Sequence, residues 1–281
     1  MNSAAAVGTW TPPKPRPVTP TTILAHELRA VFDQVEATDG VDPEVLTQLR
    51  RVRDLAVGLD PYLDGCTTPE SPALAELARR THETDWDDDV FGGRVEQEML
   101  SGHVEGQLLK FLVHLAGARR VLEIGMFTGY SALAMAEELP DNGRLIACEL
   151  DPEVAQFAQD CFDASPAGGK ITIEVGPAIE TLRRLSADPG AEFDFVFIDA
   201  DKAGYLEYVE FLLDSTLLSP RAVIAVDNTL MQGQPYIEDT TLTANGVAIA
   251  KFNAALTYDP RVEQVLVPLR DGITLIRRAP R

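Results

Sequence analysis

The chain has 281 residues, of which 45% are hydrophobic, so it can bury a sizeable core in one large domain or two smaller ones. Its net charge of −20 argues against nucleic acid or an anionic membrane as a partner, because both attract basic surfaces. No apolar run is long enough to span a bilayer, and no secretory signal opens the sequence, so we expect a soluble, cytoplasmic protein. Three cysteines without metal-site spacing fit reduced thiols in that compartment.

The first third of the chain is predicted to be helical. Residues 1–20 are rich in alanine, threonine and proline, and we expect them to be a disordered lead-in. Apolar residues then recur at helical spacing over much of residues 21–93, which we interpret as a helical N-terminal extension. Asp42 and Ser71, each followed by proline, are typical helix N-caps, and Gly58 is expected to end the helix that Asp42 begins.

A doubly wound α/β domain is predicted for residues 94–281. It starts with a long amphipathic helix that carries Leu100, Val104, Leu108, Phe111 and Leu115 on one face. Strands then alternate with helices and a hairpin ends the chain, which indicates a mostly parallel seven-stranded sheet with a reversed last strand. The predicted strands cover residues 121–124, 144–150, 171–175, 193–198, 222–226, 262–267 and 272–276, and the helices between them include residues 130–139, 177–185, 205–213 and 245–256.

A glycine turn joins the first predicted strand to its helix. Gly125 and Gly129 let the backbone turn tightly and approach a ligand closely, at the carboxyl end of the strands. The spacing differs from the Gly-x-Gly-x-x-Gly pattern of NAD sites and lacks the lysine of a phosphate-binding P-loop. Glu123, just before the turn, would repel a phosphate but suits a ligand with an amino group or a sulfonium. A purely structural turn is the alternative.

The ends of the next two strands extend this candidate cofactor site. Glu149 lies roughly 20 residues beyond the glycine turn, where a carboxylate can accept both ribose hydroxyls of an adenosyl group. A solvated Glu149 is the alternative, and Asp151 is expected to cap the following helix. Ala178, which follows a glycine and a proline at the edge of the third strand, could pack against adenine.

Polar side chains also follow two later strands. Asp199 and Lys202 come directly after the buried strand over residues 193–198, and Asp227 and Asn228 follow the next strand. Because neighbouring strand ends meet at one edge of the sheet, we expect Asp199, Asp227 and Asn228 to lie together. Two carboxylates and an amide suit a hard divalent cation, Mg²⁺ foremost, with Mn²⁺ or Ca²⁺ as alternatives. Otherwise these residues only cap loops.

Such a site can transfer a group to an oxygen. A cation held there can chelate two adjacent substrate oxygens and lower the pKa of the one that reacts. Lys202 could take the remaining proton, or it could only orient or neutralise the oxyanion; a surface-exposed Lys202 without a role is the alternative. The oxygen would then displace the methyl group of a sulfonium in line, helped mainly by positioning.

These residues resemble the cation-dependent catechol and caffeoyl-CoA O-methyltransferase family, from about Met99 to Arg278. The matching motifs are VLEIGMFTGYS at residues 121–131, DADKAGY at 199–205, DNTL at 227–230, DPRV at 259–262 and DGIT at 271–274. The resemblance implies a Rossmann-like class I fold that binds S-adenosylmethionine (SAM), and a homodimer. It implies SAM contacts at Ser101, Glu123, Gly125, Ser131, Glu149, Ala178 and Asp199, the metal ligands Asp199, Asp227 and Asn228, and a catalytic Lys202 beside Asp199.

A closer likeness covers nearly the whole chain. The motifs PTTIL at residues 20–24, GLDPYL at 58–63, CTTPES at 66–71, EQEMLSGH at 96–103, MFTGYSALAMA at 126–136 and LMQGQ at 230–234 resemble the O-methyltransferases of mycosporine-like amino acid biosynthesis. This likeness implies methylation of demethyl-4-deoxygadusol, an enolised cyclohexenone with neighbouring oxygens, to 4-deoxygadusol. It includes the N-terminal extension, which would cover the active site, build the dimer or only pack.

Other interpretations stay open. One is a catechol-type or macrolide-type O-methyltransferase with a phenolic or sugar acceptor. A CoA thioester is a poor fit, because residues 233–246 contain no lysine or arginine, and Met231 and Gln232 stand where the plant members have Trp-Asn. Another is a non-catalytic SAM-binding or dimerisation module. An NAD-dependent oxidoreductase is disfavoured by the glycine spacing.

Overall fold

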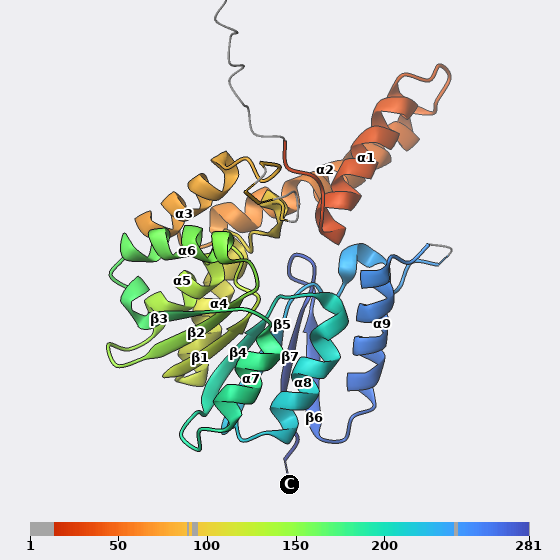
Figure 1. The fold of residues 1–281 in the computed structure, drawn as a ribbon. Coiled ribbons are helices and arrows are strands. Elements are labelled where there is room, and N and C mark those ends of the chain that lie inside the picture. The colour runs from red at the N-terminus through yellow and green to blue at the C-terminus, as the bar shows by residue number, and fades with distance from the viewer. Residues whose placement is uncertain (1–13, 89, 92–94, 239–240, 281) are drawn as a thin grey trace, which may run out of the picture.

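The strands of the computed structural model lie in one sheet with the order β3-β2-β1-β4-β5-β7-β6 (Figure 1). The structure describes residues 14–88, 90–91, 95–238 and 241–280. The strands are β1 (Arg120–Ile124), β2 (Arg144–Glu149), β3 (Ile171–Val175), β4 (Phe193–Ile198), β5 (Leu218–Val226), β6 (Val262–Val267) and β7 (Ile273–Arg278). The helices are α1 (Pro20–Glu36), α2 (Pro43–Cys66), α3 (Pro72–Glu83), α4 (His103–Ala116), α5 (Tyr130–Glu138), α6 (Pro152–Asp163), α7 (Ala178–Ser186), α8 (Tyr205–Asp214) and α9 (Ala244–Thr257).

Strand direction follows the prediction. The neighbouring strands from β3 to β5 run parallel, whereas β7 runs antiparallel to both β5 and β6. The mostly parallel seven-stranded sheet with a reversed last strand is therefore confirmed. β5 begins at Leu218, four residues earlier than expected, because its first residue pairs with Phe193 across an irregularity in the ladder. The sequence did not indicate that β5 starts at Leu218, because Pro220 cannot donate a hydrogen bond to a strand ladder.

Helices cover both faces of the sheet (Figure 1). One apolar core joins the sheet to α3, α4, α5 and α6, and the other joins it to α7, α8 and α9. In β4, Phe195 and Phe197 belong to the first core, whereas Val196 and Ile198 belong to the second. This alternation explains why the strand is apolar at every position but one, as expected for a sheet that is buried on both sides.

The N-terminal extension forms α1, α2 and α3, and α1 and α2 project away from the sheet (Figure 1). The expected end of α2 at Gly58 is wrong, because the helix continues through Gly58 and Pro61 to Cys66. A single helical glycine costs only about 1 kcal/mol, which tertiary contacts can offset. Here the end of α2 is anchored by Asp60, which accepts a hydrogen bond from Thr21 of α1 at 3.1 Å.

The buried side of helix α4 is not the side that the sequence predicted. It begins at His103, so Leu100 lies before it, and Phe111 and Leu115 are 56% and 73% exposed. The buried side carries Leu109 and Val113 instead. Gly106 determines this orientation, because it lets α4 approach α5 so closely that an added Cβ would lie 2.7 Å from the Tyr130 ring. Pattern alone could not choose between two partly apolar faces.

The start of the chain is described from residue 14 onward. Residues 1–13 of the expected lead-in lie outside the described residues, as do residues 89, 92 and 93 of the expected N-terminal extension. Helix α1 starts at Pro20, where Thr19 caps it in a reciprocal box with Thr22. Among the described helices, none combines the length and the apolar character that a membrane crossing requires.

Candidate active site

The carboxyl ends of four neighbouring strands align at one edge of the sheet. The residues at these strand ends form a row: Glu149 as the last residue of β2, then Gly125 after β1, Asp199 after β4 and Asp227 after β5. The backbone N–H groups of Asp199 and Asp227 continue the ladder, each donating to the preceding strand in this row at 2.9 Å. Neighbouring strands are about 4.8 Å apart, so this register brings the two aspartates side by side, as the sequence predicted.

The glycine turn after β1 is required by close packing. Gly125 has a φ of +87°, and a Cβ there would lie 2.2 Å from the carbonyl oxygen of Asp199. Gly129 has a φ of +86°, and its Cβ would lie 2.3 Å from the Phe162 ring. Only glycine accepts both the left-handed backbone and these contacts. The turn therefore packs directly against the end of β4 at Gly125 and against α6 at Gly129.

Glu123 presents an unsatisfied carboxylate oxygen beside this turn. The side chain is fully buried, and its Oε1 accepts a hydrogen bond from the Ser131 hydroxyl at 2.5 Å. Its Oε2 has no hydrogen-bond partner within the described residues. Burial raises the pKa of Glu123 well above its ordinary value. A ligand ammonium group would supply the missing partner, which fits the predicted role of Glu123 and Ser131.

Glu149 is held in place by backbone amides. Its carboxylate accepts hydrogen bonds from the N–H groups of Phe127 at 2.8 Å and Asp151 at 3.0 Å. Each oxygen keeps a further lone pair, so the fixed carboxylate can still accept two ligand hydroxyls. Burial raises the pKa of Glu149. Asp151 caps α6 as expected, accepting from the N–H of Glu153 at 2.9 Å.

Ser101 lies across the site from the glycine turn. It is 6% exposed and belongs to the segment between a short 3-10 helix (Gln97–Met99) and α4. Between this segment and the turn is a cavity of about 10 Å³, room for about one water molecule. The residues that line it are Met99, Leu100, Ser101, Gly125, Met126, Phe127, Thr128, Tyr130, Ser131 and Asp199. Ala178, the first residue of α7, does not line this cavity.

The predicted cation ligands lie at the neighbouring strand end. Asp227 is 4% exposed, and its Oδ1 has no hydrogen-bond partner among the residues that the structure describes. Burial, followed by the negative charge of Asp199, raises the pKa of Asp227 to about 7. Asn228 follows with a φ of +58°, a conformation that asparagine tolerates better than most residues.

Two observations bear on whether this site can hold a cation. A hard cation would compensate a buried carboxylate oxygen that has no partner and lies beside a second carboxylate. Within the described residues, however, no group of three or more histidine, cysteine, aspartate or glutamate side chains is placed to hold a metal. The predicted set contains only two carboxylates, Asp199 and Asp227, so a bound cation would also need the Asn228 amide and water or substrate oxygens.

Lys202 points into the site. Its Nζ donates to Asp199 Oδ1 at 2.8 Å, to the Tyr205 hydroxyl at 2.8 Å and to the Ala200 carbonyl at 3.1 Å. The side chain is 13% exposed, so the alternative of a surface-exposed Lys202 is wrong. The three contacts account for all three N–H groups of the ammonium, which favours a donor that neutralises charge over a proton acceptor.

Sequence reasoning missed Glu105 and Arg270. Glu105 is fully buried on α4, and its Oε2 lies 3.0 Å from Arg270 Nε. Burial raises the pKa of Glu105 well above its ordinary value, and the charge of Asp227 raises it further. The sequence did not indicate Glu105, because it shares the side of Leu109 on α4, and the burial of that side is decided by tertiary packing. Nothing local marks Arg270, which lies in the turn before β7.

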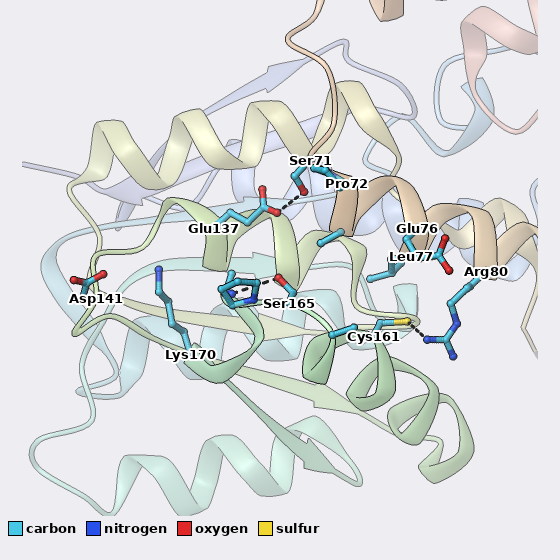
Figure 2. Close-up of a pocket in the computed structure, with 14 residues that line it drawn as sticks. Ser71, Pro72, Glu76, Leu77, Arg80, Glu137, Asp141, Cys161, Ser165 and Lys170 are labelled. Carbon is cyan, nitrogen blue, oxygen red and sulfur yellow. Dashed lines mark hydrogen bonds between the residues drawn. The ribbon is translucent and has the colours of Figure 1, made fainter.

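A larger cavity of about 750 Å³ lies away from this site (Figure 2). It opens between α3, α5 and α6 and contains none of the predicted site residues. Several of its polar groups already have hydrogen-bond partners: Arg80 donates to the Cys161 sulfur at 3.2 Å, Ser71 donates to Glu137, and Lys170 donates to backbone carbonyls at the end of α5. Size alone gives this cavity no chemical role.

Comparisons with known proteins identify the family of the chain. A family model described as O-methyltransferase matches residues 66–279. "Caffeoyl-CoA O-methyltransferase 2" of Zea mays is 36% identical over 224 residues, which cover 77% of this chain and 80% of the maize protein. The S-adenosylhomocysteine (SAH)-bound methyltransferase PaMTH1 of Podospora anserina superposes with a TM-score of 0.68 at 29% identity, covering 81% of this chain and 96% of that one. The O-methyltransferase TomG of Streptomyces achromogenes, in complex with SAM, has a TM-score of 0.67 at 30% identity and coverages of 79% and 96%.

Proposed function

Because the chain belongs to the O-methyltransferase family, as a SAM-dependent enzyme of the caffeoyl-CoA type, we propose that it methylates one of two adjacent oxygens on a small molecule with the aid of a divalent cation. Asp199, Asp227 and Asn228 would hold the cation. Membership of this family leaves no support for the NAD-dependent and non-catalytic interpretations.

The observation that carries this proposal is the buried Oδ1 of Asp227, which lies beside Asp199 and has no hydrogen-bond partner in the described part of the chain. Leaving a buried carboxylate oxygen unpaired costs several kcal/mol unless a cation or proton compensates it. The neighbouring row of strand ends carries the proposed SAM contacts, so the two halves of the reaction would meet at Asp199.

Each proposed residue has a stated task. Glu123 and Ser131 would orient the amino group of SAM, Glu149 would bind the ribose, and Ser101, Gly125 and Ala178 would enclose the remainder of the molecule. A bound cation lowers the pKa of the hydroxyl group that it coordinates. Lys202, already fixed by Asp199 and Tyr205, would neutralise the developing substrate oxyanion with its positive charge, while positioning would hold the oxygen in line with the methyl group.

The proposed acceptor is demethyl-4-deoxygadusol, with another vicinal-oxygen molecule such as a catechol as the second candidate. Support comes from the sequence likeness over the N-terminal extension, which the structure describes as α1, α2 and α3. Residues 233–246 contain no lysine or arginine that could bind the phosphates of CoA. A free small molecule is therefore proposed in place of the CoA thioester that the maize relative's name indicates.

The test compares acceptors under identical conditions. Purified enzyme with SAM and Mg²⁺ is assayed with demethyl-4-deoxygadusol, caffeate, catechol and caffeoyl-CoA, and each is repeated with EDTA and with restored Mg²⁺. We expect turnover of the cyclohexenone that EDTA stops and Mg²⁺ restores. Good turnover of a catechol without turnover of the cyclohexenone would contradict the acceptor, and activity that survives EDTA would contradict the cation.

A homodimer is also proposed. Large apolar side chains on the projecting helices and on α4 are strongly exposed: Leu55 is 77% exposed, Tyr62 70% and Leu115 73%. Exposed apolar side chains on projecting helices are typical of subunit interfaces. We propose that the extension, residues 21–93, builds the dimer and borders the active site.

A further inference from the structure

The turn between β6 and β7 presents Arg270 to the active site in a constrained conformation. Arg270 has a φ of +49°, which is uncommon for a residue other than glycine and which surrounding contacts must maintain. Those contacts are present: Asp271 Oδ1 accepts from the N–H of Gln232 at 2.6 Å, and the Asp271 carbonyl accepts from the N–H of Leu230 at 2.8 Å. The turn is thus fixed against the segment that follows Asn228.

The Arg270 side chain spans from this turn to the other wall of the site. One terminal nitrogen donates to the Leu100 carbonyl at 3.0 Å, and Nε lies 3.0 Å from Glu105 Oε2. Its other terminal nitrogen lies 2.9 Å from the position of a Cβ on Gly102, where φ is +76°. Arg270 therefore lies against both ends of the segment over residues 100–102, which contains Ser101.

The buried carboxylate of Glu105 makes loss of the ion pair with Arg270 unfavourable. It is fully buried and has no hydrogen bond within the described residues that meets normal geometry, so the ion pair with Arg270 is its compensation. Removing one partner of a buried ion pair leaves the other charge uncompensated. Arg270 consequently has two separable tasks, to balance Glu105 and to hold the Leu100 carbonyl.

The cavity between residues 99–101 and the glycine turn is narrow. Its volume of about 10 Å³ is far below the roughly 300 Å³ or more of a small-molecule site. The segment must move outward when a ligand of that size enters, and the bond from Arg270 to Leu100 opposes this movement.

We propose that Arg270 is a positioning residue that latches residues 100–102 over bound SAM, with Glu105 orienting its guanidinium group. The proposal rests on the proposed function in one respect, the assignment of Ser101 to SAM. A latched segment is pre-organised for the ligand and slows its departure, so the expected effect of Arg270 is on cofactor affinity and dissociation rate more than on the methyl-transfer step.

The experiment separates the two tasks of Arg270. Wild type, R270Q, E105Q and the double variant E105Q/R270Q are compared by SAH titration calorimetry, by the SAH dissociation rate and by thermal unfolding. We expect R270Q to bind SAH about ten-fold more weakly, with faster dissociation, as the loss of one hydrogen bond from a charged donor implies. Its Tm should also fall, because Glu105 is left unpaired.

The double variant E105Q/R270Q distinguishes the two tasks of Arg270. It should regain the Tm lost in R270Q, since no buried charge remains, yet keep the weakened SAH affinity, since the bond to Leu100 is still missing. R270K, which keeps the charge but has a single donor group, should lose less Tm than R270Q and still release SAH faster than wild type.

Recovery of both Tm and SAH affinity in the double variant would show a merely structural pair and overturn the proposal. Wild-type SAH affinity in R270Q would overturn it too, while leaving the proposed function intact. Failure of the wild-type protein itself to bind SAH would reject both.

Discussion

Asp227 has a buried carboxylate oxygen that a bound cation would compensate. We expect Asp227→Ala to lower metal-dependent turnover at least about 100-fold, because the cation supplies several kcal/mol of charge stabilisation. SAH binding should stay within about two-fold of wild type, since the proposed SAM contacts lie on other strand ends. Steady-state kinetics with Mg²⁺ and SAH calorimetry measure the two effects.

Thermal unfolding in EDTA supplies the control for Asp227. Removing a buried carboxylate with an unpartnered oxygen relieves a cost, so metal-free Asp227→Ala should melt at a higher temperature than metal-free wild type. A lower Tm would mean that the carboxylate is satisfied in a way that its surroundings do not show.

Glu149 provides the opposite pattern at the neighbouring strand end. Glu149→Ala should weaken SAH binding about ten-fold, through loss of the ribose contact and of the amide bonds that hold the glycine turn. Mg²⁺ affinity, followed by titration of the SAH-free protein, should be unchanged. If Glu149→Ala removed the cation and Asp227→Ala removed SAH, the two half-sites would have been interchanged.

At the scale of the elements, His103 ties α2 to the start of α4. Its Nδ1 lies 2.7 Å from Asp64 Oδ1 and its Nε2 lies 2.6 Å from the Thr68 carbonyl oxygen. Both partners are acceptors, and a neutral imidazole can donate from only one nitrogen, so this geometry selects the protonated ring. Burial alone lowers the pKa of His103, but the bonds to Thr68 and Asp64 outweigh it and raise the pKa.

This contact predicts a pH-dependent stability. Because the pKa of His103 is higher in the folded chain, its contribution is fully present below the unfolded value of about 6.5 and is lost as pH rises through the folded value. Urea unfolding of wild type should therefore show a free energy of unfolding that declines above about pH 6.5, and His103→Gln should lack that component.

The matched control for His103 is His26→Gln, which changes an exposed histidine of α1. It should keep the wild-type dependence on pH. The same decline in His103→Gln as in wild type would place the pH-sensitive group elsewhere.

At the scale of the whole molecule, the exposed apolar side chains of α2 and α4 predict the oligomeric state. Leu55→Asp should convert the proposed dimer to a monomer, because it places a charge in the interface. Light scattering after size-exclusion chromatography measures the mass. Tyr258→Asp, at the far end of α9 and 85% exposed, is the control and should stay dimeric.

The dependence of the oligomeric state on salt concentration is an independent test of the homodimer. Each chain carries a net charge of −20, so two copies repel each other, and added salt should favour the dimer by screening. A wild-type protein that runs as a monomer at every salt concentration would contradict the homodimer.

Most of the sheet and the residues at its edge were predictable from local pattern. Apolar runs such as residues 193–198 identify buried strands, and strand–helix alternation determines that they run parallel. Since parallel strands end at one edge, Gly125, Glu149, Asp199 and Asp227 were expected together, and the observed register aligns them. Chain order alone contained that information.

Contacts between distant segments were beyond the reach of the sequence. The buried side of α4 depends on how closely Gly106 approaches Tyr130, and the length of α2 depends on an anchor from Thr21. The meeting of Glu105 with Arg270 likewise needs the assembled sheet, because it joins a helix before β1 to a turn before β7. Periodicity reports only what a residue's near neighbours in the chain determine, whereas these features arise from packing between elements that the chain order separates.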